Sequence, residues 1–232
     1  KLLFKVFSLG SNKNEKSLDT SPGEKLCGSL EDMGTTFIKL GQFLATRPDI
    51  IGDKIAGDLE KLQDKLPAFD TEKAKNIIEK EIGSKSFKNI LSLSKPIAAA
   101  SIAQVHFAKI RIDDQEKDLA IKILRPNIHS LVNEELDALM FLAFLIESIF
   151  KKTKRLKLVE VISLLKEITN VEMDLRFEAA AAGELRDNTI NDEGIIVPKI
   201  YWSYTSKRVL TLDRIDGCLL YTSPSPRDSS QS

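Results

Sequence analysis

Hydrophobic residues recur at every third or fourth position in three early segments of the chain, residues 26–45, 51–62 and 74–82. This spacing predicts three amphipathic helices, each with one apolar face. Asp70 precedes the third segment as a predicted N-cap, and Gly83 follows it as a predicted stop. The pattern therefore favours a helical region in the first part of the chain.

The pattern changes to strands in the middle of the chain. Residues 96–111 and 119–124 are rich in apolar and β-branched side chains, and the polar residues 113–117 between them predict a hairpin. These elements predict an α+β fold in which helices pack around a small antiparallel sheet. Further helices are predicted at residues 128–150, 158–169 and 172–188, and further strands at residues 195–198, 200–204 and 208–212.

The most apolar stretch of the chain is residues 136–150, which includes Asp137 and Glu147. A helix needs roughly 20 apolar residues to span a bilayer. This stretch is shorter and contains two charges, so it is interpreted as a buried helix of a globular core.

The overall charge argues against a nucleic-acid partner. Lys and Arg number 34, as do Asp and Glu, so the formal net charge is zero, whereas nucleic-acid binders carry a strong basic excess. A local basic run at residues 151–157 is the exception. It predicts a solvated connection between two helices, and the alternative is contact with anionic lipid head groups.

The cysteines and histidines predict no metal site and no disulfide framework. Cys27 and Cys218 are far apart and form no CxxC motif, which fits a reducing, cytoplasmic setting. His106 and His129 are the two histidines of the chain, and both are expected to be structural.

A strand lysine, Lys122, stands in the segment Leu119-Ala120-Ile121-Lys122. In kinases, a lysine on such a strand holds the α- and β-phosphates of ATP. A lysine in a cleft needs a carboxylate partner, and Glu178 lies in a predicted helix among small alanines that permit close packing. The alternative is an edge-strand lysine that points to water.

A segment of small residues precedes this strand, and it is named here the alanine-rich loop: Ala98, Ala99, Ala100 and Ser101. It stands where a kinase has its glycine-rich phosphate loop. A Cβ at each position restricts positive φ, so the loop is expected to be stiffer than a glycine-rich one. The alternative is simple close packing of small side chains.

Two further groups of polar residues complete the set. Lys39 and Gln42 share one face of the first helix, and Gly41 between them costs roughly 1 kcal/mol relative to alanine in a helix. Such a glycine suggests close approach of another backbone or of a ligand. Glu172 and Asp174 are expected to open a helix, where the dipole favours carboxylates, and to lie nearer to Lys39 than to Lys122.

In this order along the chain, these groups resemble the signatures of the UbiB/ABC1/ADCK family of atypical kinases, over about residues 26–217. The family's KxGQ motif corresponds to Lys39 and Gln42, and its ExD motif to Glu172 and Asp174. Both are regulatory elements of the family. The segment around Asp213 resembles the last N-lobe strand and the hinge that contacts adenine.

The resemblance implies a protein-kinase-like N-lobe with a helical KxGQ extension and extra inserted helices. It implies an ATP-dependent kinase or ATPase that supports ubiquinone (coenzyme Q) biosynthesis. ATP or ADP is the implied cofactor, with Mg²⁺ in the full-length protein, and quinone-pathway lipids or proteins and a membrane surface are implied partners. Lys122 and Glu178 are the implied catalytic residues, and the alanine-rich loop, Lys122 and Asp213 the implied nucleotide-binding ones.

The family's catalytic-loop aspartate and asparagine and its metal-binding aspartate lie after the hinge. Nothing after Gly217 resembles them, so the chain as given is expected to lack a C-lobe, to hold no metal and to be inactive. The full-length protein is expected in the cytoplasm, peripheral to the inner membrane. The tail, residues 218–232, has no apolar periodicity and resembles translated sequencing-adapter read-through.

Two other functions remain open on sequence alone: a non-catalytic helical interaction module and a lipid or membrane-surface binding module. The predicted domain organisation has four parts: a flexible segment at residues 1–25, the helical extension at 26–95, the N-lobe at 96–217 and a disordered, non-native tail at 218–232.

Overall fold

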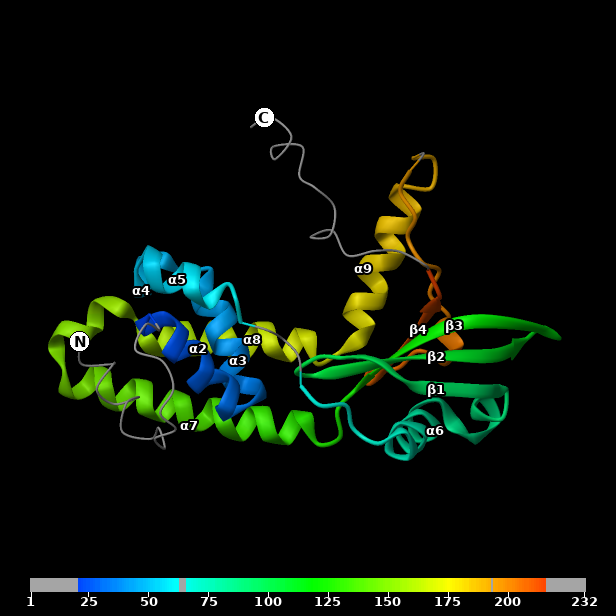
Figure 1. Ribbon diagram of the computed structural model, residues 1–232, viewed down its shortest axis with the longest axis horizontal. Coiled ribbons are helices and arrows are strands. Elements are labelled where there is room, and N and C mark those ends of the chain that lie inside the picture. Colours follow the sequence, from blue (N-terminus) through cyan, green and yellow to red (C-terminus); the bar gives the residue numbers. More distant parts are fainter. Residues whose placement is uncertain (1–20, 63–65, 193, 216–232) are drawn as a thin grey trace.

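The computed structural model describes residues 21–62, 66–192 and 194–215 of the chain. It shows an elongated molecule with a helical part at one end and an antiparallel sheet at the other (Figure 1). The α+β class is therefore confirmed. The helical part contains α2 (Pro22–Met33), α3 (Thr35–Ala45), α4 (Pro48–Ile51), α5 (Asp53–Leu59), α7 (Ile128–Ile149), the 3₁₀ helix η1 (Lys151–Leu156) and α8 (Leu158–Glu172). The sheet part contains α6 (Thr71–Phe87), α9 (Leu175–Asn188), the 3₁₀ helix η2 (Trp202–Tyr204) and the strands β1 (Ile90–Ala99), β2 (Ala103–Ile112), β3 (Gln115–Leu124) and β4 (Val209–Asp213).

The strand order in the sheet is β1-β2-β3-β4, and all neighbours are antiparallel. Asp113 and Asp114 connect β2 to β3 with φ of 50° and 59°. Positive φ at both central residues is the two-residue hairpin turn whose twist matches that of the strands. The predicted hairpin is therefore present, with a shorter turn than the sequence indicated.

The first strand is the main addition to the predicted sheet. β1 begins at Ile90, and residues 100–102 turn the chain into β2, so the single strand predicted at 96–111 belongs to two strands. Pro96 lies within β1, which is an edge strand. A proline has no N–H to donate, and an edge strand tolerates this loss because one of its sides is unpaired.

The two strands predicted at residues 195–198 and 200–204 are wrong. The first segment is irregular, and the second contains a single bridge from Ile200 to Leu212 followed by η2. Short apolar runs are compatible with several backbone conformations, and this run lies along β4 without becoming a strand.

The helix predicted at residues 26–45 is two helices. It breaks at Gly34, whose φ of 98° lies outside the range that an L-residue readily adopts. The first helix also begins earlier than expected, because Ser21 and Glu24 form a reciprocal capping box around Pro22. Of the predicted flexible segment, residues 1–20 lie outside the described residues.

The helix predicted at residues 172–188 begins later, at Leu175. Asp174 is its N-cap and accepts a hydrogen bond from the backbone N–H of Arg176. Glu172 is instead the last residue of α8, so the prediction that it opens a helix is wrong. Asp70 caps α6 as predicted, and Gly83, with φ of 81°, breaks the helical geometry of α6 one turn before its end.

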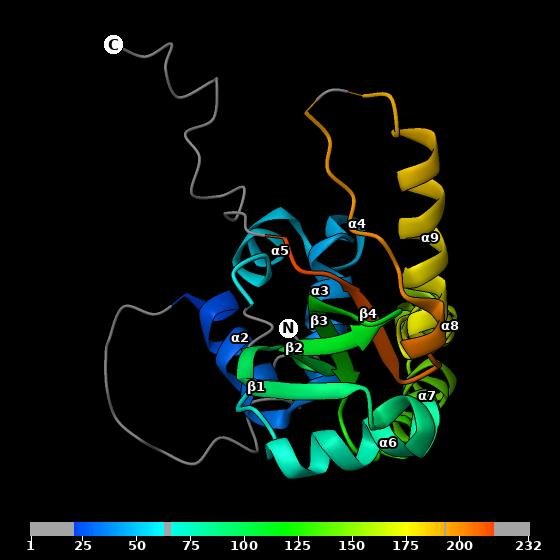
Figure 2. The same ribbon diagram turned by 90° about the vertical axis from the view of Figure 1, so that its right-hand side faces the viewer.

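Alternation along β3 decides which side chains face which helix. Ile121 and Ile123 are buried against Ile77 and Ile78 of α6. Because successive side chains of a strand point to opposite faces, Lys122 projects away from α6, toward the α9 side of the sheet. Figure 2 shows α6 and α9 flanking different parts of the sheet.

The prediction that residues 136–150 form a buried helix is only half right. The segment is helical within α7, and Leu136 and Ala143 are buried against α3, α8 and the end of the sheet. Phe141, Phe144 and Ile149 are exposed, so the opposite face of the helix is open. No helix in the described ranges is long and apolar enough to cross a membrane.

Candidate functional site

The centre of the candidate site is an ion pair between β3 and α9. The Nζ atom of Lys122 lies 2.9 Å from Oε1 and 2.7 Å from Oε2 of Glu178, so the ammonium bridges both carboxylate oxygens. The Lys122 side chain is 29% exposed and that of Glu178 48%, so water reaches the pair. The pairing predicted from charge compensation is present, whereas the catalytic role of the two residues stays a prediction.

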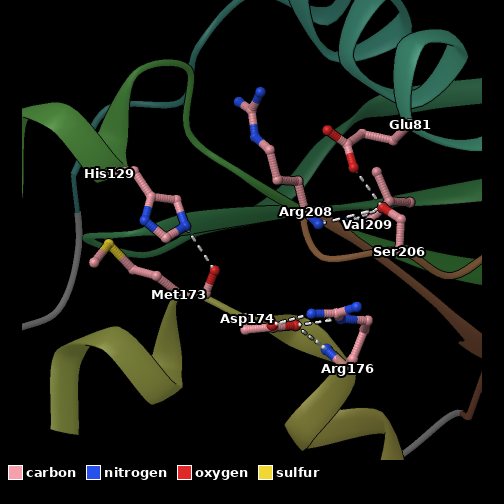
Figure 3. Close-up of polar contacts among 8 residues, drawn as sticks. All are labelled: Glu81, His129, Met173, Asp174, Arg176, Ser206, Arg208 and Val209. Carbon is pink, nitrogen blue, oxygen red and sulfur yellow. Dashed lines mark hydrogen bonds and ion pairs between the residues drawn. The ribbon is translucent and has the colours of Figure 1, made fainter. Parts of the chain in front are cut away.

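Local structure at the start of α9 places Glu178. Asp174 accepts hydrogen bonds from the backbone N–H and the guanidinium of Arg176, which rigidly defines the first turn (Figure 3). The Arg176 guanidinium also holds the pKa of Asp174 below its ordinary value. Asp174 is thus committed to capping α9, and its carboxylate binds Arg176 rather than Lys39.

A second ion pair connects the segment of Lys39 and Gln42 with the segment of Glu172 and Asp174. Lys39 of α3 lies 2.9 Å from the carboxylate of Glu172 at the end of α8, so one of the two carboxylates predicted near Lys39 pairs with it. The Lys39 side chain is largely buried, so screening by solvent weakens this pair less than a surface pair. Gln42 is half-buried on the next turn of α3. The regulatory role of these residues remains untested.

The alanine-rich loop joins β1 to β2. Ala98 and Ala99 end β1, and the amide of Ala100 donates a 2.8 Å hydrogen bond to the carbonyl of Ala103. Ala98 pairs with Val105, which in turn pairs with Lys122, so the loop begins two strands away from the lysine. Neighbouring strands are about 4.8 Å apart, which places Ala98 about 10 Å from the Lys122 backbone.

Ser101 differs from the alanines of the loop. Its side chain is fully buried, and its carbonyl accepts a 3.1 Å hydrogen bond from Oγ1 of Thr35 at the start of α3. Nucleotide binding by Ser101 stays a prediction. In the structure, the residue attaches the loop to the helix that carries the KxGQ motif.

Arg125 is a site residue that the sequence reading missed. Its Nε and Nη2 donate hydrogen bonds of 3.0 and 2.8 Å to the carbonyl of Ala100, and its Nη1 donates one of 2.9 Å to the carbonyl of Pro67. The guanidinium therefore holds the alanine-rich loop against the segment that leads into α6. In the sequence, Arg125-Pro126 indicated only the end of a strand. The signal that could have pointed to Arg125 was its position three residues after the strand lysine, Lys122.

His106 and Gln104 form a buried network on β2, below the alanine-rich loop. His106 Nδ1 lies 2.8 Å from the carbonyl of Ser94, which can only accept, so Nδ1 carries the proton. Its Nε2 then accepts from Nε2 of Gln104 at 2.8 Å, and Gln104 also bonds both backbone groups of Phe69. Burial lowers the pKa of His106 below its ordinary 6.5. The structural role predicted for this histidine fits the network.

Acid is expected to destabilise the protein through His106. A lowered pKa favours the neutral ring in the folded state. The contribution of His106 to the stability is therefore fully present above pH 6.5, its ordinary pKa, and is lost as the pH falls through the lowered pKa of the folded state. We expect His106→Asn, whose amide can still donate to Ser94, to be less stable at pH 7.5 but to lose less stability between pH 7.5 and 5. Urea unfolding at both values measures this.

His129→Asn is the matched control for that experiment. The Nε2 atom of His129 lies 3.0 Å from the carbonyl of Met173 (Figure 3) and is half-exposed. The control should keep the acid sensitivity of the native chain. Equal acid sensitivity in the native chain and in His106→Asn would contradict the assignment of this sensitivity to His106.

Asp213 at the end of β4 holds the predicted hinge in place. Its Oδ1 accepts a 2.8 Å hydrogen bond from the Tyr201 hydroxyl, and its Oδ2 accepts one of 3.2 Å from the Lys199 amide. Burial, together with the bond to this carboxylate, raises the pKa of Tyr201 to about 12. The phenol therefore keeps its proton at neutral pH. Both oxygens of the Asp213 side chain accept hydrogen bonds within the protein, and the role of Asp213 in nucleotide binding stays a prediction.

Within residues 21–62, 66–192 and 194–215, no group of three acidic, histidine or cysteine side chains could hold a metal ion. A surface hollow of about 780 Å³ lies between α2 and the α4–α5 turn, lined by Pro22, Gly23 and neighbours of Ile55. It contains none of the predicted site residues.

Comparison with known proteins assigns the family. Residues 61–229 match the model of the ABC1 atypical kinase-like domain, a range that extends into the tail, whose predicted foreign origin stays untested. A "Probable protein kinase UbiB" from Marinobacter nauticus is 39% identical over 198 residues, 85% of this chain and 36% of the relative. Proteins of the same name from Pseudomonas paraeruginosa and Pseudomonas aeruginosa are 36% identical over 203 residues, 87% of this chain and 38% of each relative. The chain thus spans less than two fifths of these relatives, and it belongs to the ABC1 atypical kinase-like family.

Proposed function

We propose that this chain is the nucleotide-binding part of a UbiB-like atypical kinase or ATPase that supports ubiquinone biosynthesis at the cytoplasmic side of the inner membrane. The observation that carries the proposal is the bridge between Lys122 and both carboxylate oxygens of Glu178. A strand lysine paired to a glutamate on the adjacent helix is the arrangement that positions a nucleotide in protein kinases. The family membership supports it.

The residues of this chain can supply three contacts to ATP or ADP. Two of the three N–H donors of the Lys122 ammonium go to the Glu178 carboxylate, which leaves one for a phosphate oxygen, and Glu178 holds the ammonium on the α9 side of the sheet. The exposed end of β1 at Ala98 offers backbone to the phosphates. The backbone after Asp213 offers hydrogen bonds to adenine, because the strand edge there is held by Tyr201.

The alanine-rich loop makes these contacts different from those of a glycine-rich loop. Cβ atoms hold a phosphate farther from the backbone, and Arg125 and Thr35 keep the loop from moving closer. In this proposal, the loop selects a nucleotide pose with longer phosphate contacts, and Lys122 supplies most of the attraction.

We propose phosphoryl transfer from ATP for the whole protein rather than for this chain. Phosphoryl transfer needs metal ions on the phosphates and a residue that orients the nucleophile. The described residues offer no carboxylate cluster that fits Mg²⁺, so they do not by themselves account for a metal site. We expect the chain to bind adenine nucleotide without hydrolysing it.

Nucleotide binding by the 232-residue chain tests the proposal. We expect ATP and ADP to raise the melting temperature and Lys122→Ala to weaken binding about tenfold or more, since hydrogen bonds to charged groups contribute about 1.5–3 kcal/mol. Lys109→Ala removes another strand lysine, 3.7 Å from Glu116, and should bind normally.

Two results would count against it. Equal affinity of the Lys122→Ala and Lys109→Ala variants would show that the lysine has no part in binding. Absence of any nucleotide effect on the native chain would favour a non-catalytic interaction module.

A further inference from the structure

A row of apolar side chains crosses the sheet beside Lys122, and it is named here the apolar row: Phe107, Ala120 and Leu212. In the strand register, Phe107 of β2 pairs with Ala120 of β3, and Ala120 pairs with Leu212 of β4. Side chains of directly paired residues share one face of a sheet, and Ala120 is two residues from Lys122, so the row lies on the same face as the lysine. Two residues span about 7 Å along a strand, so a ligand at Lys122 can also reach the apolar row.

This face of the sheet is open along β2. Val105 and Phe107 are half-buried, whereas Ala108 and Ile110, which point to the opposite face, are buried in the cluster that includes α6. Leu212 of β4 is half-buried as well. An antiparallel sheet usually presents polar side chains on a face that meets water. Apolar side chains on the open face therefore indicate a surface that is used for contact.

A guanidinium lies at the end of this surface. The Cζ atom of Arg214 is 4.1 Å from the centre of the Phe107 ring, which is the spacing of a stacked pair. The Arg214 amide donates a 3.5 Å hydrogen bond to the carbonyl of Asp118, so the residue continues β4 and lies farther from Lys122 than Leu212 does. Its side chain crosses β3 to reach the ring on β2, and the small side chain of Ala120 leaves room for it.

We propose, on the basis of the nucleotide-binding function proposed above, that Phe107 and Arg214 hold the nucleoside part of the nucleotide, whereas Lys122 holds its phosphates. The apolar row receives the flat face of the base, and the Phe107–Arg214 stack bounds the base at the end away from Lys122. A guanidinium has N–H donors and no acceptor, so Arg214 binds acceptor atoms of the nucleoside, the ring nitrogens of the base and the oxygens of the ribose.

The chemistry of the surface favours a nucleoside over a covering protein segment. Aromatic rings and arginine guanidinium planes are the groups on which nucleobases stack. The surface also continues directly to the lysine, because Val105 on the open face is the β2 partner of Lys122. Its occupant must therefore combine a flat apolar part with an anionic part about one row away, and a nucleotide has both.

Equilibrium binding of ATP and of inorganic tripolyphosphate by the 232-residue chain tests the proposal, because tripolyphosphate has the phosphates without the nucleoside. We expect Arg214→Met and Phe107→Leu each to weaken ATP binding about tenfold, the usual size of a lost base stack, and to leave tripolyphosphate binding unchanged. Lys122→Ala should weaken the binding of both. Unchanged tripolyphosphate binding also shows that the Arg214 and Phe107 variants are folded.

Lys117→Met is the matched control. It removes another cation beside an aromatic ring, 5.5 Å from the centre of Tyr201, on the α6 face of the same sheet. This variant should bind ATP and tripolyphosphate normally. Because Arg214 is exposed and Phe107→Leu keeps an apolar side chain, the melting temperatures of these two variants should stay close to that of the native chain.

Three results would overturn the proposal. Equal ATP affinity of Arg214→Met, Phe107→Leu and Lys117→Met would show that a protein segment, not the nucleotide, covers the apolar row. Equal affinity of the native chain for ATP and tripolyphosphate would show that the nucleoside adds no binding, while the role of Lys122 would stand if Lys122→Ala weakened both. Binding of neither ATP nor tripolyphosphate would contradict the proposed function as well.

Discussion

Replacing Gly41 with valine is expected to lower the free energy of unfolding by about 1–3 kcal/mol, the usual cost of overpacking a core. A Cβ at this position would overlap the Leu62 side chain and would lie 2.8 Å from that of Leu30. Both leucines are buried in one cluster with Leu59, so they have little room to move. Urea or thermal unfolding measures the effect.

Gly57→Ala is the matched control for this prediction. Gly57 is exposed within α5, and a Cβ there would meet nothing within 4 Å. Alanine is favoured over glycine in a helix interior, so we expect a gain of about 0.5–1 kcal/mol. If Gly41→Val were as stable as the native chain, the packing of α3 against α2 and α5 would be looser than the structure shows.

This outcome would also decide why the KxGQ segment contains its glycine. The sequence suggested close approach of a backbone or a ligand to Gly41. In the structure the approaching atoms are leucine side chains from α2 and from the residues after α5. Gly41 therefore allows α3 to pack closely against these leucines. This packing holds Lys39, on the same helix, within reach of Glu172.

Replacing Arg125 with methionine is expected to cost about 2 kcal/mol of stability and to mobilise the alanine-rich loop. The substitution removes three hydrogen bonds from a charged donor, two to the Ala100 carbonyl and one to that of Pro67. Urea unfolding and hydrogen exchange of the amides in residues 98–104 measure the two effects. If the proposed function holds, nucleotide affinity also changes, because the loop loses its fixed position.

Arg111→Met is the control for Arg125. Arg111 lies on the surface of β2, 3.6 Å from Glu116, and an exposed pair of this kind contributes little. Arg125→Lys should recover part of the stability, because lysine keeps the charge and loses the two-pronged geometry. Unchanged exchange in the loop of Arg125→Met would show that backbone bonds alone hold it.

The sequence alone predicted the elements with a strong apolar periodicity and the pairing of lysines with carboxylates. α6 has a capping aspartate, an apolar stripe and a glycine near its end, and all three signals act within a few residues. Lys122 and Glu178 are 56 residues apart, yet a charge in a cleft needs a partner, and the order of the motifs restricted the choice. The same reasoning placed Glu172 and Asp174 near Lys39; Glu172 pairs with Lys39, whereas Asp174 binds Arg176.

Only the tertiary structure decided the features that depend on contacts between distant parts of the chain: hydrogen-bond partners, strand pairing and burial. Arg125 could not be recognised as the residue that holds the alanine-rich loop, because its acceptors are main-chain carbonyls, which every residue has. The short strands predicted before β4 failed because a strand requires a paired neighbour, and that segment has one bridge. The apolar pattern of α7 predicted a helix correctly but not its exposure, since periodicity shows which side chains are apolar and burial requires other elements to cover them.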